Sequence, residues 1–233
     1  MPYSYIEKNL TRIKAELAAV AARAGRPTPT LVAVTKSASD EEVLALAALH
    51  GGPIAENRVP NFRARRELLL SAGFATPMHL IGSLQTNKVK YIAADAAIIE
   101  SLDSPRLAAE IERQGARIGR RIPVLIELNS GREAAKGGLL PEEVLPFHAA
   151  LTGGDYPHIA VAGLMTMGPA CEREEEYRPY FRETRALFDE IRKRGGFVGD
   201  GYLSMGMSDS YRVATEEGAM GVRIGRALFR REN

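Results

Sequence analysis

The sequence has no tryptophan, a single cysteine and no long apolar run. The last two features exclude a disulfide within the chain and a membrane-spanning helix. Cys171, the one cysteine, cannot form a disulfide within the chain. No segment reaches the roughly 20 apolar residues that a membrane-spanning helix needs, and the N-terminal residues lack the apolar core of a signal peptide. These features predict a cytoplasmic protein without a membrane span.

Charge of one sign is not in excess either, because 31 basic residues stand against 29 acidic ones. Nucleic-acid-binding proteins usually gather basic charge on one face. The short basic runs here, 63–66 and 192–194, lie in helix-like stretches and are interpreted as solvated helix faces. We therefore expect no nucleic-acid partner. No cluster of His, Cys and carboxylate residues has metal-ligand spacing, so no metal site is predicted.

From residue 30 onward the sequence alternates apolar runs with amphipathic stretches. Most of the runs are rich in Val, Ile and Leu, as strands buried on both faces are. They predict eight strands, at 30–36, 53–57, 78–83, 97–102, 123–129, 160–165, 201–205 and 221–224. Helices are predicted at 40–50, 61–72, 87–94, 105–118, 141–151, 174–194 and 208–218. A further amphipathic helix at 5–24 is expected to cover the bottom or side of the domain.

This alternation predicts an α/β fold in which residues 1–233 form one domain, a single (β/α)8 barrel with an extra N-terminal helix. The alternative is a doubly wound open sheet. Such a sheet normally carries a glycine-rich turn after its first strand, and Thr35-Lys36-Ser37-Ala38 is not one.

In a (β/α)8 barrel the active site forms where the strands end. Polar residues interrupt the apolar runs at or just beyond these ends, at Lys36, 56–58, His79, Ser83, Asn129, Thr166, Ser204 and Arg223. Lys36 is the most informative of them. One interpretation is an ordinary strand end that reaches water. The other is an amine held beside the barrel core, where it can attack a carbonyl group.

The segment Gly221-Val-Arg-Ile-Gly-Arg226 predicts a phosphate-binding turn after the eighth strand. Gly225 would let the main chain approach a phosphate closely, Ser204 could add a hydroxyl group, and Arg226 could add charge. A plain strand-to-helix turn is the alternative. Because a barrel closes between strands eight and one, this turn and Lys36 are expected to be neighbours. Together they fit a phosphorylated carbonyl compound.

Several segments, in this order, resemble the pyridoxal phosphate homeostasis protein family, which is similar to the N-terminal barrel of alanine racemase. They are Leu31-Val-Ala-Val-Thr-Lys36, Glu56-Asn-Arg-Val59, His79-Leu-Ile-Gly82, Leu84-Gln-Thr-Asn-Lys-Val-Lys90, Gly163-Leu-Met-Thr-Met167, Leu203-Ser-Met-Gly-Met-Ser-Asp209 and Val222-Arg-Ile-Gly225. The resemblance runs along nearly the whole chain and implies a (β/α)8 barrel that binds pyridoxal 5′-phosphate (PLP).

The resemblance implies these cofactor contacts: Lys36, Asn57, Met165, Ser204, Arg223, Ile224, Gly225 and Arg226. Lys36 would hold PLP as a Schiff base, and Arg223 would face the pyridine nitrogen and keep it unprotonated. Ser204, Gly225 and Arg226 would bind the phosphate, and the remaining three residues would lie near the ring or line the pocket.

The sequence departs from the family pattern at four positions. Ala55 replaces the usual glycine, and Pro60 stands where a polar residue is expected. Ser83 stands where histidine is common. Arg226 stands where a small hydroxyl residue is frequent. Arginine has no hydroxyl group, so this departure affects one hydroxyl contact to the phosphate, whereas contacts from the backbone stay possible.

Alanine racemase resembles this chain in its barrel but adds a C-terminal β domain that supplies a catalytic tyrosine across a dimer interface. This sequence ends just after the eighth strand, and no second acid/base group for racemisation is evident. We therefore expect a monomeric PLP-binding protein that stores PLP or delivers it to PLP-dependent apoenzymes, without robust turnover. The alternatives are a PLP-dependent racemase-like enzyme acting on small amino acids and a Schiff-base aldolase acting on a phosphorylated sugar.

Overall fold

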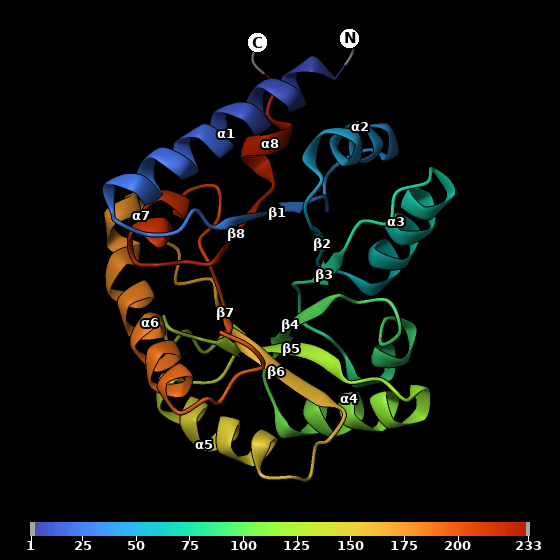
Figure 1. Ribbon diagram of the computed structural model, residues 1–233, viewed down its shortest axis with the longest axis vertical. Coiled ribbons are helices and arrows are strands. Elements are labelled where there is room, and N and C mark those ends of the chain that lie inside the picture. The colour runs from blue at the N-terminus through green and yellow to red at the C-terminus, as the bar shows by residue number, and fades with distance from the viewer. Residues whose placement is uncertain (1–2, 232–233) are drawn as a thin grey trace.

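The computed structural model describes residues 3–231, which form a closed barrel of eight parallel strands surrounded by helices (Figure 1). The strands follow one another around the barrel in chain order. They are β1 Thr30–Val34, β2 Ile54–Glu56, β3 Met78–Leu80, β4 Ile98–Leu102, β5 Ile122–Leu128, β6 Ile159–Thr166, β7 Tyr202–Met205 and β8 Gly221–Ile224. β8 pairs with β1, so the barrel is closed and the predicted fold is confirmed.

The helices lie on the outside of the barrel (Figure 1). They are α1 Ser4–Arg23, α2 Asp40–His50, α3 Val59–Ser71, η1 Thr86–Tyr91, α4 Pro105–Ile118, α5 Pro141–Thr152, η2 Glu174–Tyr177, α6 Arg178–Lys193, α7 Tyr211–Glu216 and α8 Arg226–Phe229. None of the helices in this described part is long and apolar enough to cross a membrane.

Successive strand residues face opposite sides, and two apolar cores result. The larger core lies between the strands and the helices. The smaller one fills part of the barrel interior with Val32, Val34 and Ala55, and Ile81 packs against it. Ala55, the departure from the usual glycine, is fully buried there, so its methyl group has room.

The N-terminal helix α1 lies along the side of the barrel, against α2, α7 and α8 (Figure 1). Its apolar face is buried at Ile6, Leu10, Ile13, Leu17 and Val20. Asn9 is also buried, and its amide donates to the backbone carbonyls of Leu228 at 3.0 Å and Arg230 at 2.8 Å. These two bonds satisfy carbonyl groups at the end of α8, where a helix has no partners of its own.

Three predicted helices differ from the observed ones. In place of the helix predicted at 87–94, the structure has the short 3₁₀ helix η1 at Thr86–Tyr91, followed by a turn. The helix predicted at 174–194 is divided into η2 and α6, because Pro179 has no backbone N–H and starts a new helix. The one predicted at 208–218 begins only at Tyr211. The residues before Tyr211 form a turn, in which the Ser210 hydroxyl accepts the N–H of Met207 at 3.1 Å. Such a bond from a side chain to the backbone competes with helix formation.

Candidate functional site

All strands are parallel, so their carboxyl ends lie at one end of the barrel, and Lys36 lies there. It is exposed in the turn that follows β1, two residues beyond the last strand residue. The turn is anchored on both sides: the Thr35 hydroxyl donates to Glu56 at 2.7 Å, and Arg65 of α3 donates to the carbonyl of Ala38. The backbone at Lys36 is therefore held at a defined place on the rim, and its side chain is exposed there.

Glu56, which supports this turn, is fully buried at the end of β2. Burial raises the pKa of its carboxyl, and the hydrogen bond from Thr35 and the charge of Arg65 oppose that effect. Within residues 3–231 its Oε2 has no hydrogen-bond partner. Asn57 follows directly and is half-buried, with its backbone against Gly82, where an added Cβ would lie 2.2 Å from the Asn57 carbonyl oxygen.

The turn after β8 lies beside the first strand. Gly225 precedes α8 and faces Val34, so that an added Cβ would lie 3.0 Å from the Val34 carbonyl oxygen. The hydroxyl group of Ser208 accepts the N–H of Ala227 at 3.3 Å. Arg226 is exposed and pairs with Asp209, which lies in the loop between β7 and α7. The structure thus brings Gly225 and Lys36 to neighbouring strands at the same end of the barrel.

A polar network fills the barrel interior below this rim. Arg223 donates to the Ser204 hydroxyl at 2.5 Å and to the Thr166 carbonyl at 2.8 Å. Ser204 donates in turn to Glu100 at 2.6 Å, and His79 Nδ1 lies 2.7 Å from the other oxygen of the same carboxylate. All five residues are buried. The desolvation of Glu100 is outweighed by these contacts and by the charge of Arg223, which together lower its pKa.

The structure places Ser204 on β7 and Ile224 on β8, as expected, and the surroundings of both side chains bear on the cofactor contacts predicted for them. The hydroxyl proton of Ser204 is donated to Glu100 inside the barrel, which argues against a contact from this group to a phosphate at the rim. The hydroxyl group beside the Gly225 turn belongs to Ser208 instead. Ile224 belongs to the core between strands and helices, because it alternates with the inward-facing Arg223. Its side chain therefore does not line the barrel interior.

Met165 is fully buried and lies outside the strand–helix core that contains its neighbour Leu164, so it faces the interior. It is in register with Ser204 on one side and with Glu127 on the other. Desolvation, and secondarily the charge of Asp103, raise the pKa of Glu127 to about 7.

Glu100 and Glu127 were missed by the sequence reasoning. Each is a carboxylate that interrupts an otherwise apolar run, in Ile98-Ile-Glu-Ser-Leu102 and Ile122-Pro-Val-Leu-Ile-Glu-Leu128. That interruption is a signal that could have found both. Asn129 organises the loop that follows, because its amide donates to the carbonyl of Glu133 at 2.8 Å. Among the described residues, no group of three or more His, Cys, Asp or Glu could hold a metal ion.

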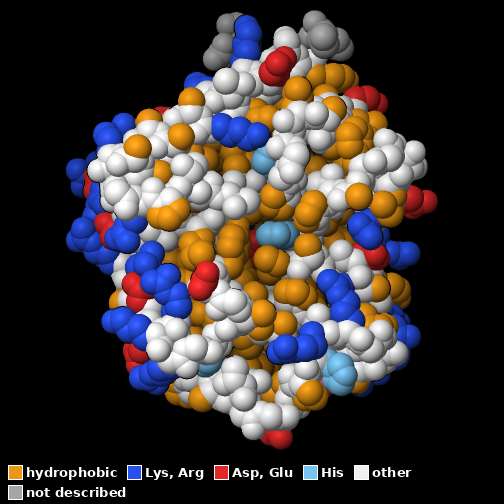
Figure 2. Space-filling view, in the orientation of Figure 1, with side chains coloured by type: hydrophobic (Ala, Val, Ile, Leu, Met, Phe, Trp, Pro, Cys, Tyr) orange, Lys and Arg blue, Asp and Glu red, His pale blue; other side chains and the backbone are white. Residues whose placement is uncertain are grey.

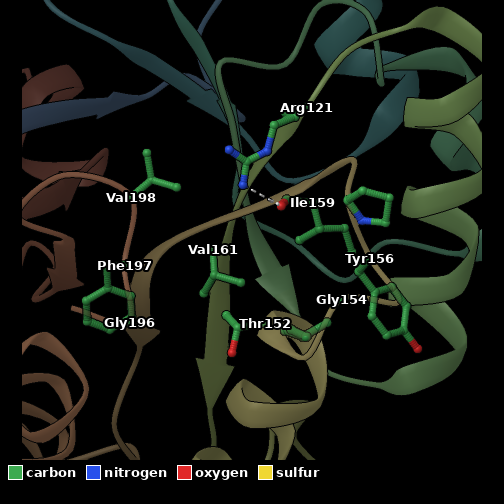
Figure 3. Close-up of a pocket in the computed structure, with 11 residues that line it drawn as sticks. Arg121, Thr152, Gly154, Tyr156, Ile159, Val161, Gly196, Phe197 and Val198 are labelled. Atoms are coloured by element: carbon green, nitrogen blue, oxygen red, sulfur yellow. Dashed lines mark hydrogen bonds between the residues drawn. The ribbon is translucent and has the colours of Figure 1, made fainter. Parts of the chain in front are cut away.

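The opposite end of the barrel carries several hollows. The one in Figure 3 has a volume of about 330 Å³ and is lined by Val161, Phe197 and Val198 among others, with Arg121 donating to the Ile159 carbonyl at 3.3 Å. None of the predicted cofactor contacts lines it. Figure 2 shows one face of the molecule, with basic and acidic side chains interspersed around its edge and apolar side chains between them.

Comparisons with known proteins agree with this architecture. Residues 9–232 match the family described as the N-terminal domain of alanine racemase. A pyridoxal phosphate homeostasis protein of Aquifex aeolicus is 44% identical over 175 residues, which are 75% of this chain and 74% of the relative.

Two solved structures share the fold over almost their whole length. An unknown protein from Bifidobacterium adolescentis has a TM-score of 0.89 at 31% identity, covering 97% of this chain and 95% of that one. PipY of Synechococcus elongatus, solved with PLP bound, has a TM-score of 0.80 at 24% identity, covering 97% and 100%. Given the family match and the Aquifex relative, the chain belongs to the pyridoxal phosphate homeostasis protein family, whose barrel is that of the alanine racemase N-terminal domain.

Proposed function

We propose that this chain binds PLP as a Schiff base on Lys36 and holds it for delivery to PLP-dependent apoenzymes. The observation that carries the proposal is the register of β1 and β8, which brings the exposed Lys36 amine and the Gly225 turn to one end of the barrel. Relatives named for pyridoxal phosphate homeostasis and a PLP-bound structure of the same fold support it.

The residues present fit such a cofactor. Gly225 leaves the main chain bare where a phosphate would approach, and a side chain there would press against β1. The backbone N–H groups of Gly225 and Arg226 would hold the phosphate, and the Ser208 hydroxyl beside them, which accepts the N–H of Ala227, would donate its own proton to it. Arg223 would face the ring nitrogen from below, and Met165 would lie against the ring.

Arg226 would add positive charge near the phosphate rather than a direct bond, because its guanidinium group is engaged by Asp209. Asn57, half-buried beside the Lys36 turn, would lie near the ring edge. PLP supplies an aldehyde that reacts reversibly with amines. The Lys36 nitrogen would form a bond to the aldehyde carbon with loss of water, and addition of water would reverse the step.

The exposure of Lys36 supports a carrier. Water and incoming amines can reach its nitrogen from the rim, so the bond to PLP can be hydrolysed or exchanged rather than sealed inside the barrel. A racemase-like enzyme acting on small amino acids is the second candidate. Glu127 favours it, because a carboxyl group with a pKa of about 7 can exchange protons near neutral pH.

A titration of the purified protein with PLP tests the proposal. We expect an absorbance band near the visible edge that borohydride abolishes, and its loss in Lys36→Ala. Lys90→Ala, which changes an exposed lysine of η1, is the matched control and keeps the band. Absence of the band from the wild type would refute the proposal. Chiral analysis after incubation with L-amino acids separates the two functions, since turnover on the order of 1 per second or faster would favour the enzyme.

A further inference from the structure

Glu100 and Arg223 form an ion pair deep inside the barrel. Glu100 is fully buried, Arg223 is 3% exposed, and their nearest charged atoms are 3.7 Å apart. Burying two charges is costly, and apolar side chains of similar volume often stabilise a core as well or better. The pair is therefore poorly explained by stability alone, and its geometry suggests a role in orientation.

The contacts of Arg223 fix its guanidinium plane. One terminal nitrogen donates to Ser204 at 2.5 Å and the other donates to the Thr166 carbonyl at 2.8 Å. A planar fork held at both terminal nitrogens cannot rotate about its own axis without breaking a buried hydrogen bond. A guanidinium group has five N–H donors, so this clamp leaves others for a ligand.

Glu100 determines which way this chain of hydrogen bonds runs. It accepts the Ser204 proton at 2.6 Å, so the serine oxygen is left to accept from Arg223. Its second oxygen is occupied by His79 at 2.7 Å, so the carboxylate is held on both sides. The ring of His79 is in turn packed edge-on against Tyr202, with ring centroids 6.5 Å apart.

We propose that Glu100, acting through Ser204, is a positioning residue that holds Arg223 as a fixed hydrogen-bond donor toward an uncharged ring nitrogen of the ligand. The inference rests on the proposed function and deepens it by naming the residue that sets the orientation of Arg223. An arginine does not give up its proton, so it recognises a nitrogen that accepts a hydrogen bond. The site then prefers phosphorylated aldehydes of pyridine to the same compounds built on a benzene ring.

Equilibrium titrations with two probes test this inference: PLP, and its analogue in which a C–H group replaces the ring nitrogen. Glu100→Gln removes the buried anion, and Ser204→Ala removes the bridging hydroxyl without removing a charge. Glu112→Gln is the matched control, because Glu112 pairs with His158 Nδ1 at 2.6 Å near the start of β6, at the other end of the barrel. Circular dichroism establishes that each variant is folded.

We expect the wild type and Glu112→Gln to bind PLP about ten- to a hundredfold more tightly than the analogue, as one hydrogen bond from a charged donor would give. Glu100→Gln and Ser204→Ala should lose most of this preference, through weaker binding of PLP and unchanged binding of the analogue. If Glu100→Gln does not fold, Ser204→Ala decides the matter, since it leaves both buried charges in place.

The outcomes separate the two proposals. If both variants keep the preference, or if the wild type binds the two probes equally, the role of Glu100 is wrong while PLP binding stands. If the wild type forms no Schiff-base band with either probe, the proposed function itself fails, and the inference fails with it.

Discussion

Replacing Glu127 with glutamine should stabilise the protein above neutral pH. Glu127 faces the barrel interior, is 6% exposed, and its carboxyl group makes no hydrogen bond to the described residues. Desolvation and the nearby charge of Asp103 raise its pKa from 4.5 to about 7, and the attraction of Arg223 only partly opposes them. Glutamine has nearly the same shape and carries no charge to desolvate.

The magnitude follows from the two pKa values. In the unfolded chain the carboxyl group loses its proton near pH 4.5, and in the folded protein it does so only near pH 7. Between these values the folded state binds more protons than the unfolded state, so stability falls as pH rises. The contribution of protonated Glu127 to the stability of the folded protein is fully present below pH 4.5 and is lost by about pH 7. The free energy of unfolding changes by about 3 kcal/mol over this range.

Urea denaturation of the wild type and Glu127→Gln at several pH values between 4.5 and 8.5 measures this difference. All other groups titrate in both proteins, so the difference between the two free energies of unfolding isolates Glu127. We expect the variant to gain stability relative to the wild type as pH rises, up to about 3 kcal/mol at pH 8. A difference that does not change with pH would refute the reasoning about this carboxyl group.

Two further substitutions test the fold itself. Asn9→Ala should lower the free energy of unfolding by about 2 kcal/mol, because it removes the donor to the buried carbonyl of Leu228 and to the carbonyl of Arg230; chemical denaturation checks this. Gly163→Ala should cost about 3 kcal/mol or more, since its Cβ would lie 1.8 Å from the Tyr202 carbonyl oxygen of β7. Gly137→Ala, whose nearest contact would be 3.4 Å away, is its control and should change thermal unfolding little.

The barrel could be predicted because buried parallel strands leave a clear trace in sequence. Val32 and Val34 face the interior while Leu31 and Ala33 face the helices, so both faces of β1 are apolar and the run is continuous. The short helices were less predictable. Turns such as that at Ser210 form through side-chain-to-backbone hydrogen bonds, which an apolar pattern does not report.

The site was predicted in part. The polar residues that end β1 and follow β8 reach one rim because barrel closure follows from eight strands in order. The assignments of Ser204 and Ile224 required knowledge of which side of a strand each residue faces. A strand of four residues such as β8 gives too few alternations to establish that from sequence.

The two buried carboxylates were missed for a related reason. Glu100 and Glu127 lie within apolar strands, where a single charged residue resembles a strand end or an exposed position. Only the folded barrel shows that Glu100 faces His79 and Ser204, residues far from it in sequence. Long-range partners of this kind are what make a buried charge tolerable.

The central claim is that Lys36 holds PLP covalently. Its most direct test is borohydride reduction of the PLP-loaded protein, followed by proteolysis and mass spectrometry of the lysine-containing peptides. Reduction fixes the cofactor to the nitrogen that carried it. The account predicts one stoichiometric label, on the peptide that contains Lys36. A label spread over other lysines, or none on Lys36, would contradict it.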